Sequence, residues 1–407
     1  MAAGIVFALL LSNFYWGTGF IRDWIKPFGT IFINSLKLIA VPLILASLIK
    51  GVSDLGDLSK LSKMGSRTII TFILTTFVAV SIGLICVNLI KPGNTISEET
   101  RNNLLAGYAN EVTGRIELAQ EQKESGPLQA LEDIVPSNIF FAASDNTKML
   151  QVIFFAIIFG ISLILIPSEN AKPVKDFFNG FNDVILKMID IIMKGAPYGV
   201  FALMAALVVE SPDSNLFSAL ALYAITVIAG LFLMLGVYAA IVYISSRTNP
   251  KKFFKAIAPA QLLAFSTSSS AATLPVTMEC VENNLRVPKE VASFVLPIGA
   301  TINMDGTSLY QAVAAVFIAQ AFGMDLNLET QLMIILTATL ASIGSAAVPG
   351  AGMVMLVIVL AQAGIPEAGL ALIFAIDRPL DMCRTVINVS GDAAVSVMIN
   401  EIYTDEL

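Results

Sequence analysis

The stretch 377–392, DRPLDMCRTVINVSGD, carries charged and amide side chains between apolar runs. At helical spacing, steps of three and four residues place these on one face: Asp377, Asp381, Arg384, Asn388 and Asp392, with Thr385 at its shoulder. A guanidinium is a planar, permanently charged fork for a carboxylate, and a carboxylate one turn earlier can take an ammonium group. The stripe therefore predicts a site for a solute that carries both charges, as an acidic amino acid does.

The composition decides how much this stripe means. Hydrophobic residues make up 56% of the 407 residues, charged residues only 14%, and the mean hydropathy is +0.79, which indicates a polytopic membrane protein. A charged side chain near the bilayer centre costs about 2.5–3.5 kcal/mol, so such residues persist where they face a cavity or bind something. The structural alternative is that Asp381 and Arg384 only pair to pin two helices together.

Other features of the sequence exclude several classes of function. There is no histidine, which removes histidine acid–base chemistry, a Ser-His-Asp triad and the usual zinc sites. The three cysteines, Cys86, Cys280 and Cys383, give no disulfide framework. The net charge of −7 resides mostly in 98–133 and 401–406 and does not suggest nucleic acid.

Apolar runs predict membrane-spanning helices along most of the chain. We expect them at 2–20, 25–49, 68–90, 152–166 (entered in pieces from 128), 177–209, 216–244, 293–322 and around the stripe. Basic residues in 50–67, 172–175 and 247–255 mark the cytoplasmic side. The polar segment 94–132 is expected to form an external loop, and no cleavable signal is evident.

Two apolar segments, 253–281 and 332–361, are interrupted by small polar residues. The first has five hydroxyl residues at 266–270 and then Pro275, with basic residues on both flanks, so we expect it to enter the bilayer and return on the same side. One polar, kinked spanning helix is the alternative. Each broken segment precedes a helix with a polar core, which suggests duplicated units that place a site at the bilayer midplane between inverted repeats.

The first of these polar cores is Asn303-Met304-Asp305-Gly306-Thr307. Gly306 loosens the helix, and local unwinding would set side-chain oxygens beside freed carbonyls. Small hard cations such as sodium require several oxygen ligands of this kind. A simple helix N-cap at Asp305 is the alternative, although it leaves backbone groups to satisfy in mid-membrane.

Four motifs together resemble the excitatory amino acid transporter family, also called the dicarboxylate/amino acid:cation symporters. They are TSSSAATLP at 267–275, ATINMDGTSLYQ at 300–311, ASIGSAAVPGAG at 341–352 and LDMCRTVINVSGD at 380–392. The APYGVFAL run at 196–203 agrees, and the resemblance covers essentially the whole chain.

The resemblance implies an all-α polytopic membrane protein with eight transmembrane helices, two re-entrant helical hairpins (about 249–285 and 327–363) and inverted repeats. It implies a homotrimer in the cell membrane, plasma or inner, with both termini cytoplasmic. Scaffold helices would lie in 1–64 and 128–210, and an external loop in 93–127. The transport domain, 65–92 and 211–407, would carry substrate across in an elevator motion.

The resemblance also implies roles for particular residues. Arg384 would bind the side-chain carboxylate of the substrate and Asp381 its amino group. The expected substrate-binding residues are Ser268, Ser269, Ser270, Met304, Thr307, Val348, Gly352, Asp381, Arg384, Thr385 and Asn388. Three sodium sites are expected: Gly299, Asn303, Asn388 and Asp392 for one ion; Thr301, Met304, Ser342, Ile343 and Ser345 for a second; Thr75, Thr76, Asn303 and Asp305 for a third.

This chain departs from the family pattern at three places. Archaeal members have an arginine where Ser268 stands and eukaryotic members have one where Met382 stands, so Arg378 is a candidate substitute. Proton- and potassium-coupled members have a glutamate where Gln311 stands, and a glutamine takes up no proton, which favours sodium-only coupling. Phe72 replaces an aromatic hydroxyl expected near the third sodium site.

The predicted function is sodium-coupled symport of aspartate or glutamate across a lipid bilayer, with no organic cofactor, no enzymatic activity and no nucleic-acid partner. A proton- or sodium-coupled C4-dicarboxylate symporter is the alternative. An intramembrane hydrolase would use Asp305 and Asp392 as a carboxylate pair or a serine of 266–270 as nucleophile, but no base partners these serines. A channel would need a continuous polar pore, whereas the polar groups cluster in one half of the sequence.

Overall fold

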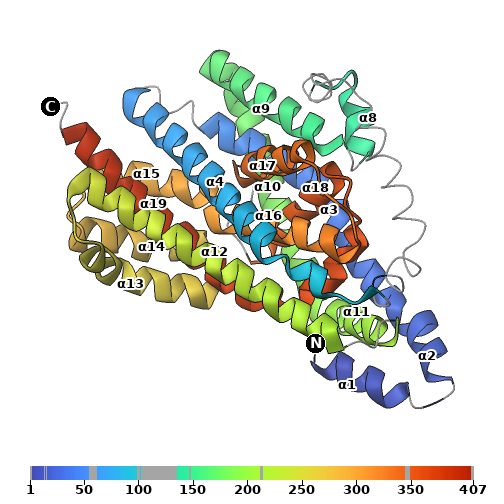
Figure 1. Cartoon of the computed structure of the whole chain (residues 1–407). Coiled ribbons are helices and arrows are strands. Elements are labelled where there is room, and N and C mark those ends of the chain that lie inside the picture. Colours follow the sequence, from blue (N-terminus) through green and yellow to red (C-terminus); the bar gives the residue numbers. More distant parts are fainter. Residues whose placement is uncertain are drawn as a thin grey trace.

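The computed structural model describes residues 2–12, 14, 16–54, 62–98, 101, 135–145, 148–210, 214–343 and 349–404. This part of the chain is helical, with no strand (Figure 1). The all-α prediction is therefore confirmed for it. Most of the expected external loop lies outside the described residues, as do Ser345 and Val348.

The N-terminal region differs from the single span expected at 2–20. It forms α1 (Ala2–Leu11), then α2 (Gly17–Phe20), the π-helical turn η1 (Ile21–Ile25) and α3 (Lys26–Asp54). The turn after α1 is held by the Phe14 amide donating to the Leu11 carbonyl at 2.9 Å. A Cβ on Gly17 would collide with that same carbonyl oxygen. The close approach permitted by one glycine ends the helix, and an apolar composition does not reveal this.

The next helices follow the expected runs with one further break. They are α4 (Ser62–Ile90), η3 (Pro92–Thr95), α8 (Ile139–Ser144), α9 (Met149–Leu165), α10 (Ser168–Lys194) and α11 (Ala196–Glu210). Entry into α9 in pieces is confirmed by α8. The run expected as one helix at 177–209 is instead α10 and α11, bent by 49° at Gly195. Pro197 explains the bend, because it has no N–H to donate to the preceding turn.

After α12 (Ser214–Ser246) the chain forms a helical hairpin from α13 (Pro250–Thr267) and α14 (Ser270–Glu279), followed by η5 (Cys280–Asn284). The two arms pack against each other, so the chain folds back and is not one kinked helix. Ser268 makes the turn in the left-handed region (φ 52°), and the Ser269 hydroxyl caps α14 by accepting from the Ala272 amide at 3.1 Å.

The second broken segment also pairs two helices, α17 (Leu328–Ile343) and α18 (Ala351–Gln362). Between the hairpins lie α15 (Lys289–Ile302) and α16 (Asp305–Ala321), separated at Asn303 and Met304. Of the unwinding predicted within 303–307, the structure confirms the break at Asn303 and Met304, where Asn303 has an extended conformation (φ −89°, ψ 90°), whereas Asp305, Gly306 and Thr307 already form the first turn of α16. The chain ends with η6 (Glu367–Gly369) and α19 (Leu370–Thr404), which carries the polar stripe.

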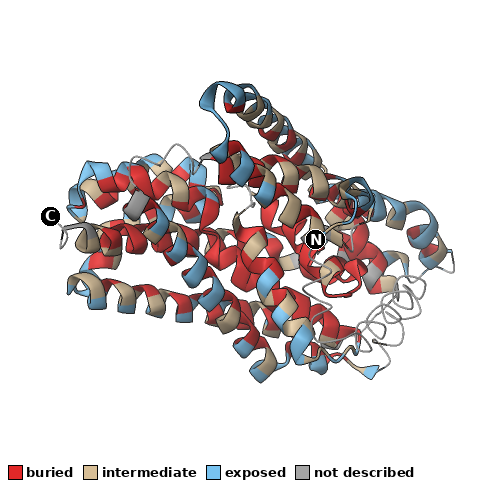
Figure 2. Ribbon diagram, turned by 90° about the horizontal axis from the view of Figure 1, so that it is seen from above, coloured by how far each residue is buried: buried red, intermediate tan, exposed pale blue. Residues whose placement is uncertain are grey.

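Helix α19 lies at the centre of the part of the chain that carries the polar residues. It packs against α12, α13, α15 and α16, and α4 packs on α16 and α12. Figure 1 shows α12 and α19 running side by side as long helices, and Figure 2 shows buried residues along the middle of the molecule. A separate set of helices is organised around α3. Helices α9, α10 and α11 pack on α3, and α1 packs on α11.

The two sets meet at an ion pair between α3 and η6 and at an aromatic contact between α3 and α19. Lys37 Nζ lies 2.5 Å from Glu367 Oε2, and the Glu367 side chain is 2% exposed. Nearby, the rings of Phe32 and Phe374 are 5.2 Å apart between centroids. A buried carboxylate at this boundary therefore has a cation from the opposite set of helices.

Among the described residues, three helices are long and apolar enough to cross a membrane, or four if the bent pair α10–α11 is one span. Helix α19 has 35 residues but is not among them. It carries charged residues, which include Asp377, Asp381, Arg384 and Asp392. The structure thus agrees with an all-α membrane protein, and the expected eight spans stay a prediction.

Candidate functional site

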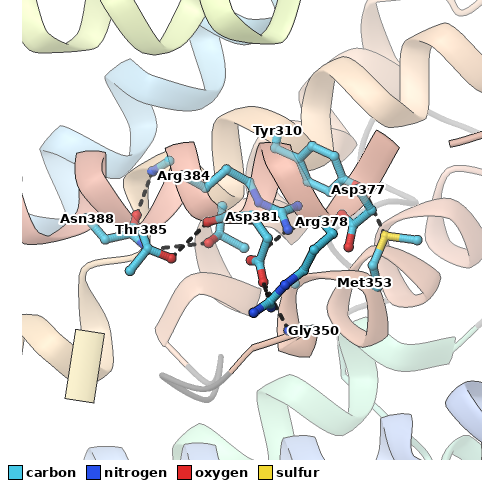
Figure 3. Close-up of polar contacts among 12 residues, drawn as sticks. Tyr310, Gly350, Met353, Asp377, Arg378, Asp381, Arg384, Thr385 and Asn388 are labelled. Atoms are coloured by element: carbon cyan, nitrogen blue, oxygen red, sulfur yellow. Dashed lines mark hydrogen bonds and ion pairs between the residues drawn. The ribbon is translucent and has the colours of Figure 1, made fainter. Parts of the chain in front are cut away.

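Arg384 of α19 is completely buried and only partly paired. Its Nη2 atom donates to Asp381 Oδ1 at 2.7 Å and lies 3.1 Å from Asp377 Oδ1, while Tyr310 of α16 stacks on the guanidinium, 3.8 Å from Cζ to the ring centroid (Figure 3). Nε and Nη1 have no hydrogen-bond partner. Buried donors are nearly always paired, so these free N–H groups indicate an anionic ligand.

The Asp381–Arg384 pair lies within one helix, three residues apart, so it does not pin two helices together. Asp381 is also contacted through its other oxygen. The Gly350 amide, at the tip of the second hairpin, donates to Asp381 Oδ2 at 3.2 Å, and Arg378 Nη1 lies 3.5 Å from the same atom. Arg378 thus reaches the site, although its side chain is 59% exposed.

The backbone of Gly352 packs close to the free Nη1 atom of Arg384. A Cβ on Gly352 would lie 3.0 Å from Thr307 Cγ2 and 3.5 Å from Arg384 Nη1. The second hairpin therefore covers Arg384 with a backbone that has no side chain at this point.

Asn388 connects α19 to the break between α15 and α16. Its Oδ1 accepts from the Gly306 amide at 2.8 Å, and its Nδ2 donates to Met304 Sδ at 3.3 Å and Thr307 Oγ1 at 3.4 Å. The side chain thereby satisfies an amide at the start of α16 that has no helical partner. It also brings the predicted Met304 and Thr307 beside the stripe.

One group of predicted cation ligands surrounds Asp392. Asn303 Nδ2 donates to Asp392 Oδ1 at 2.9 Å, and a Cβ on Gly299 would collide with the same oxygen. Asp392 is 2% exposed and Asn303 is fully buried. A carboxylate is thus held against the backbone of α15, where neutral oxygens are close by.

A second group surrounds Asp305 at the start of α16. Thr76 Oγ1 of α4 donates to Asp305 Oδ1 at 2.6 Å, and the Tyr238 hydroxyl of α12 donates to Oδ2 at 2.6 Å. Thr75 Oγ1 lies 3.5 Å from Asn303 Oδ1. The structure brings together all four residues expected at the third cation site.

The residues expected at the second sodium site differ in how far they are buried. Ser342 Oγ donates to the Ile302 carbonyl at 2.9 Å and accepts from the Met304 amide at 3.1 Å, so α17 is tied to the break. Ile343 is half-buried at the end of α17. Thr301 is exposed, and its hydroxyl donates to the Ile298 carbonyl at 2.9 Å.

Ser268, Ser269 and Ser270 are buried at the tip of the first hairpin. The Ser268 hydroxyl has no hydrogen-bond partner. In α19, Thr385 Oγ1 donates to the backbone carbonyl of Asp381 at 2.9 Å. Its hydroxyl is therefore paired within the helix and does not bind the carboxylates of the stripe.

The charges of this region do not balance. Asp305, Asp377, Asp381 and Asp392 are buried, whereas Arg384 is the one buried cation in the described part of the chain. With Arg378 at Asp381 counted as well, four carboxyl groups face two guanidinium groups, so carboxyl groups are in excess. No three acidic, cysteine or histidine side chains converge within that part, so a cation there would have at most two carboxylate ligands and otherwise neutral oxygens. Such a low-charge oxygen cage fits a monovalent hard cation.

Sequence reasoning missed two tyrosines. Tyr310 lies one helical turn after Thr307, so its position on the same face was a usable signal. Tyr238 stands in a uniformly apolar run, and nothing in its neighbourhood marks it. Asp377 was on the predicted stripe, but its approach to Arg384 was not foreseen.

Comparisons with known proteins give one family model and several similar chains. Residues 1–402 match the model of the sodium:dicarboxylate symporter family. The chain is 36% identical over 404 residues to a proton/sodium-glutamate symport protein of Geobacillus stearothermophilus, covering 98% of this chain and 92% of that one. It is 38% identical over 417 residues to excitatory amino acid transporter 3 of Oryctolagus cuniculus, covering 93% and 79%. Excitatory amino acid transporter 2 of Rattus norvegicus is 34% identical over 424 residues, covering 93% and 73%.

Substituting Gly299→Ala tests whether the Asp392 carboxylate belongs to a cation site. The methyl group would displace Asp392 Oδ1, so sodium should stabilise this variant against thermal unfolding at least about tenfold less potently than the parent, since a carboxylate ligand is misplaced. Gly236→Ala is the matched control, because a Cβ there meets nothing within 4 Å. Equal sodium sensitivity of the two variants would contradict the site.

Proposed function

Because the chain belongs to the sodium:dicarboxylate symporter family, we propose that it is a sodium-coupled symporter of acidic amino acids, aspartate or glutamate. The observation that supports this most strongly is the buried Arg384, whose Nη1 is unpaired beside Gly352 and Thr307. The free donors take the side-chain carboxylate of the substrate.

Asp381 favours an amino acid over a plain C4 dicarboxylate. Its carboxylate lies next to the guanidinium and its Oδ2 is held only by donors at 3.2 and 3.5 Å. The ammonium group of an amino acid can take the place of these long contacts, whereas the second carboxylate of a dicarboxylate would meet a like charge. A C4-dicarboxylate symporter therefore stays the second candidate, supported by the family description alone.

Sodium coupling follows from the excess negative charge. An acidic amino acid brings one further negative charge to a region where carboxyl groups already outnumber the guanidinium groups, so we expect cations to enter with it. Asp392 with Asn303 and Gly299, and Asp305 with Thr75 and Thr76, are the residues that would hold two of these ions. The set expected for the remaining ion, which includes Met304 and Ser342, contains no carboxylate and would offer only uncharged ligands.

We propose that sodium is the coupling ion without a proton. Gln311 is buried, and its Nε2 donates to the Gly352 carbonyl at 3.3 Å in the hairpin above Arg384. A glutamine there binds the hairpin but does not titrate.

We propose that residues 65–92 and 211–407 move as an elevator against 1–64 and 128–210, in a homotrimer with eight spans, two re-entrant hairpins and cytoplasmic termini. The packing supports this division, because α4, α12, α15 and α16 gather around α19, whereas α9, α10 and α11 gather around α3. Few elements cross between the sets, chiefly α18 against α3, α11 against α19, and the Lys37–Glu367 pair.

The proposed function is tested in proteoliposomes with an imposed sodium gradient. We expect concentrative uptake of labelled aspartate that disappears without the gradient. Passive current without accumulation would indicate a channel, and accumulation of succinate in preference to aspartate would support the second candidate.

Arg384→Ala should weaken aspartate binding about 100-fold or more, because hydrogen bonds to charged groups contribute about 1.5–3 kcal/mol each. Calorimetry at saturating sodium measures this. Arg22→Ala, at a side chain that is 68% exposed, is the control and should bind normally. Unchanged aspartate affinity in a folded Arg384→Ala protein would refute the pocket.

The elevator proposal predicts that joining α3 to η6 stops transport but not binding. In a background without the three native cysteines, Lys37→Cys with Glu367→Cys should be cross-linked by a short bifunctional thiol reagent. Uptake should then fall about tenfold or more, because the two sets of helices can no longer slide. Lys187→Cys with Asp190→Cys, both on α10, is the control that should cross-link without loss of uptake.

A further inference from the structure

Tyr238 of α12 is a fully buried tyrosine with a specific polar contact. Its hydroxyl donates to Asp305 Oδ2 at 2.6 Å, while Thr76 of α4 donates to Oδ1 at 2.6 Å. The two oxygens of one carboxylate are therefore held by hydroxyl groups from two helices, α4 and α12, that pack on α16 and on each other. This fixes the plane of the carboxylate before any cation enters.

The surrounding backbone is shaped around this hydroxyl. A Cβ on Gly391 of α19 would lie 2.6 Å from the Tyr238 hydroxyl oxygen and 2.8 Å from Asn303 Nδ2. Asn303 in turn donates to Asp392 Oδ1. Tyr238 thus packs against the backbone of α19 at Gly391, next to Asn303. A residue larger than glycine at 391 would displace the Tyr238 hydroxyl.

The aromatic residue that α4 brings to this region cannot do the same. Phe72 is fully buried, and its Cζ would lie 2.9 Å from a Cβ on Gly299, on the side of Asp392. Its ring has no donor or acceptor. Tyr238 of α12 supplies the phenolic hydroxyl that binds Asp305 instead.

We propose that Tyr238 is a positioning residue of the cation site around Asp305 and sets the sodium affinity of that site. This rests on the proposed function. A hydroxyl donates to the carboxylate without neutralising it, so Asp305 keeps its negative charge for a cation, and the phenolic oxygen keeps lone pairs that point into the same region. A lysine or arginine at this position would compensate the charge and remove the need for an ion.

Tyr238→Phe removes one hydroxyl and keeps the ring. The sodium concentration that gives half-maximal aspartate binding should rise about tenfold, because one charge-assisted hydrogen bond to Asp305 is lost. Aspartate affinity at saturating sodium should stay within about twofold of the parent, because Arg384 and Asp381 are untouched. A purely structural role would weaken both quantities together.

Tyr243→Phe is the matched control, since Tyr243 lies five residues later on α12 and is 51% exposed. It should leave the sodium dependence unchanged. In an Asp305→Asn background, adding Tyr238→Phe should change sodium-induced thermal stabilisation by less than about twofold, because the charge that the hydroxyl positions is already gone.

Two results would overturn the inference: an unchanged sodium requirement in folded Tyr238→Phe protein, or an additive effect of the two substitutions. If Tyr238→Phe does not fold, Gly391→Ala displaces the hydroxyl without removing it, although it also crowds Asn303 Nδ2; an unchanged sodium requirement there is then the decisive result and also overturns the inference. Sodium-induced stabilisation of the substrate-free protein gives the same comparison without aspartate. A parent that sodium stabilises but that binds neither aspartate nor glutamate would refute the proposed function and leave this inference standing.

Discussion

The cost of holding unbalanced charge away from water governs this structure. Four buried aspartates face one buried guanidinium, that of Arg384, and the more exposed Arg378 reaches only Asp381, so carboxyl groups outnumber the basic groups that face them. Bound cations would balance this excess. The same imbalance explains why an anionic solute can be accommodated only together with positive ions, which is the physical basis of symport.

Hydroxyl and amide groups orient these carboxylates without cancelling them. Asp305 is bound by Thr76 and Tyr238, and Asp392 by Asn303, each through uncharged donors. By contrast, Asp381 and Asp377 lie at a cation, Arg384. The region thus separates into carboxylates that shape a guanidinium for a substrate and carboxylates that stay available for ions.

Broken helices are what allow such a region to exist inside a helical protein. The interruption at Asn303 and Met304 leaves amides that Asn388 and Ser342 satisfy, and it brings residues of α15, α16, α17 and α19 to one depth. The second hairpin closes over this region, since the Gly350 amide donates to Asp381 and the Gly352 backbone packs closely on Thr307 and Arg384. Asn388 and Met304 connect the break to the stripe of α19 by a direct contact.

The sequence by itself determined the helical class, the two broken segments, a break within 303–307 and the polar face of α19, because period and composition are local properties; the break lies at Asn303 and Met304. It placed Asp381, Arg384 and Asn388 on one stripe for the same reason. Only the tertiary structure decided that α1 ends at Leu11, where Gly17 meets a carbonyl, and that Tyr310 and Tyr238 complete the site. The turn after α1 depends on a close backbone approach that composition does not reveal. The contacts of the two tyrosines depend on the approach of helices distant in the chain, and a buried tyrosine in an apolar run looks the same whether it packs against lipid or donates to a carboxylate.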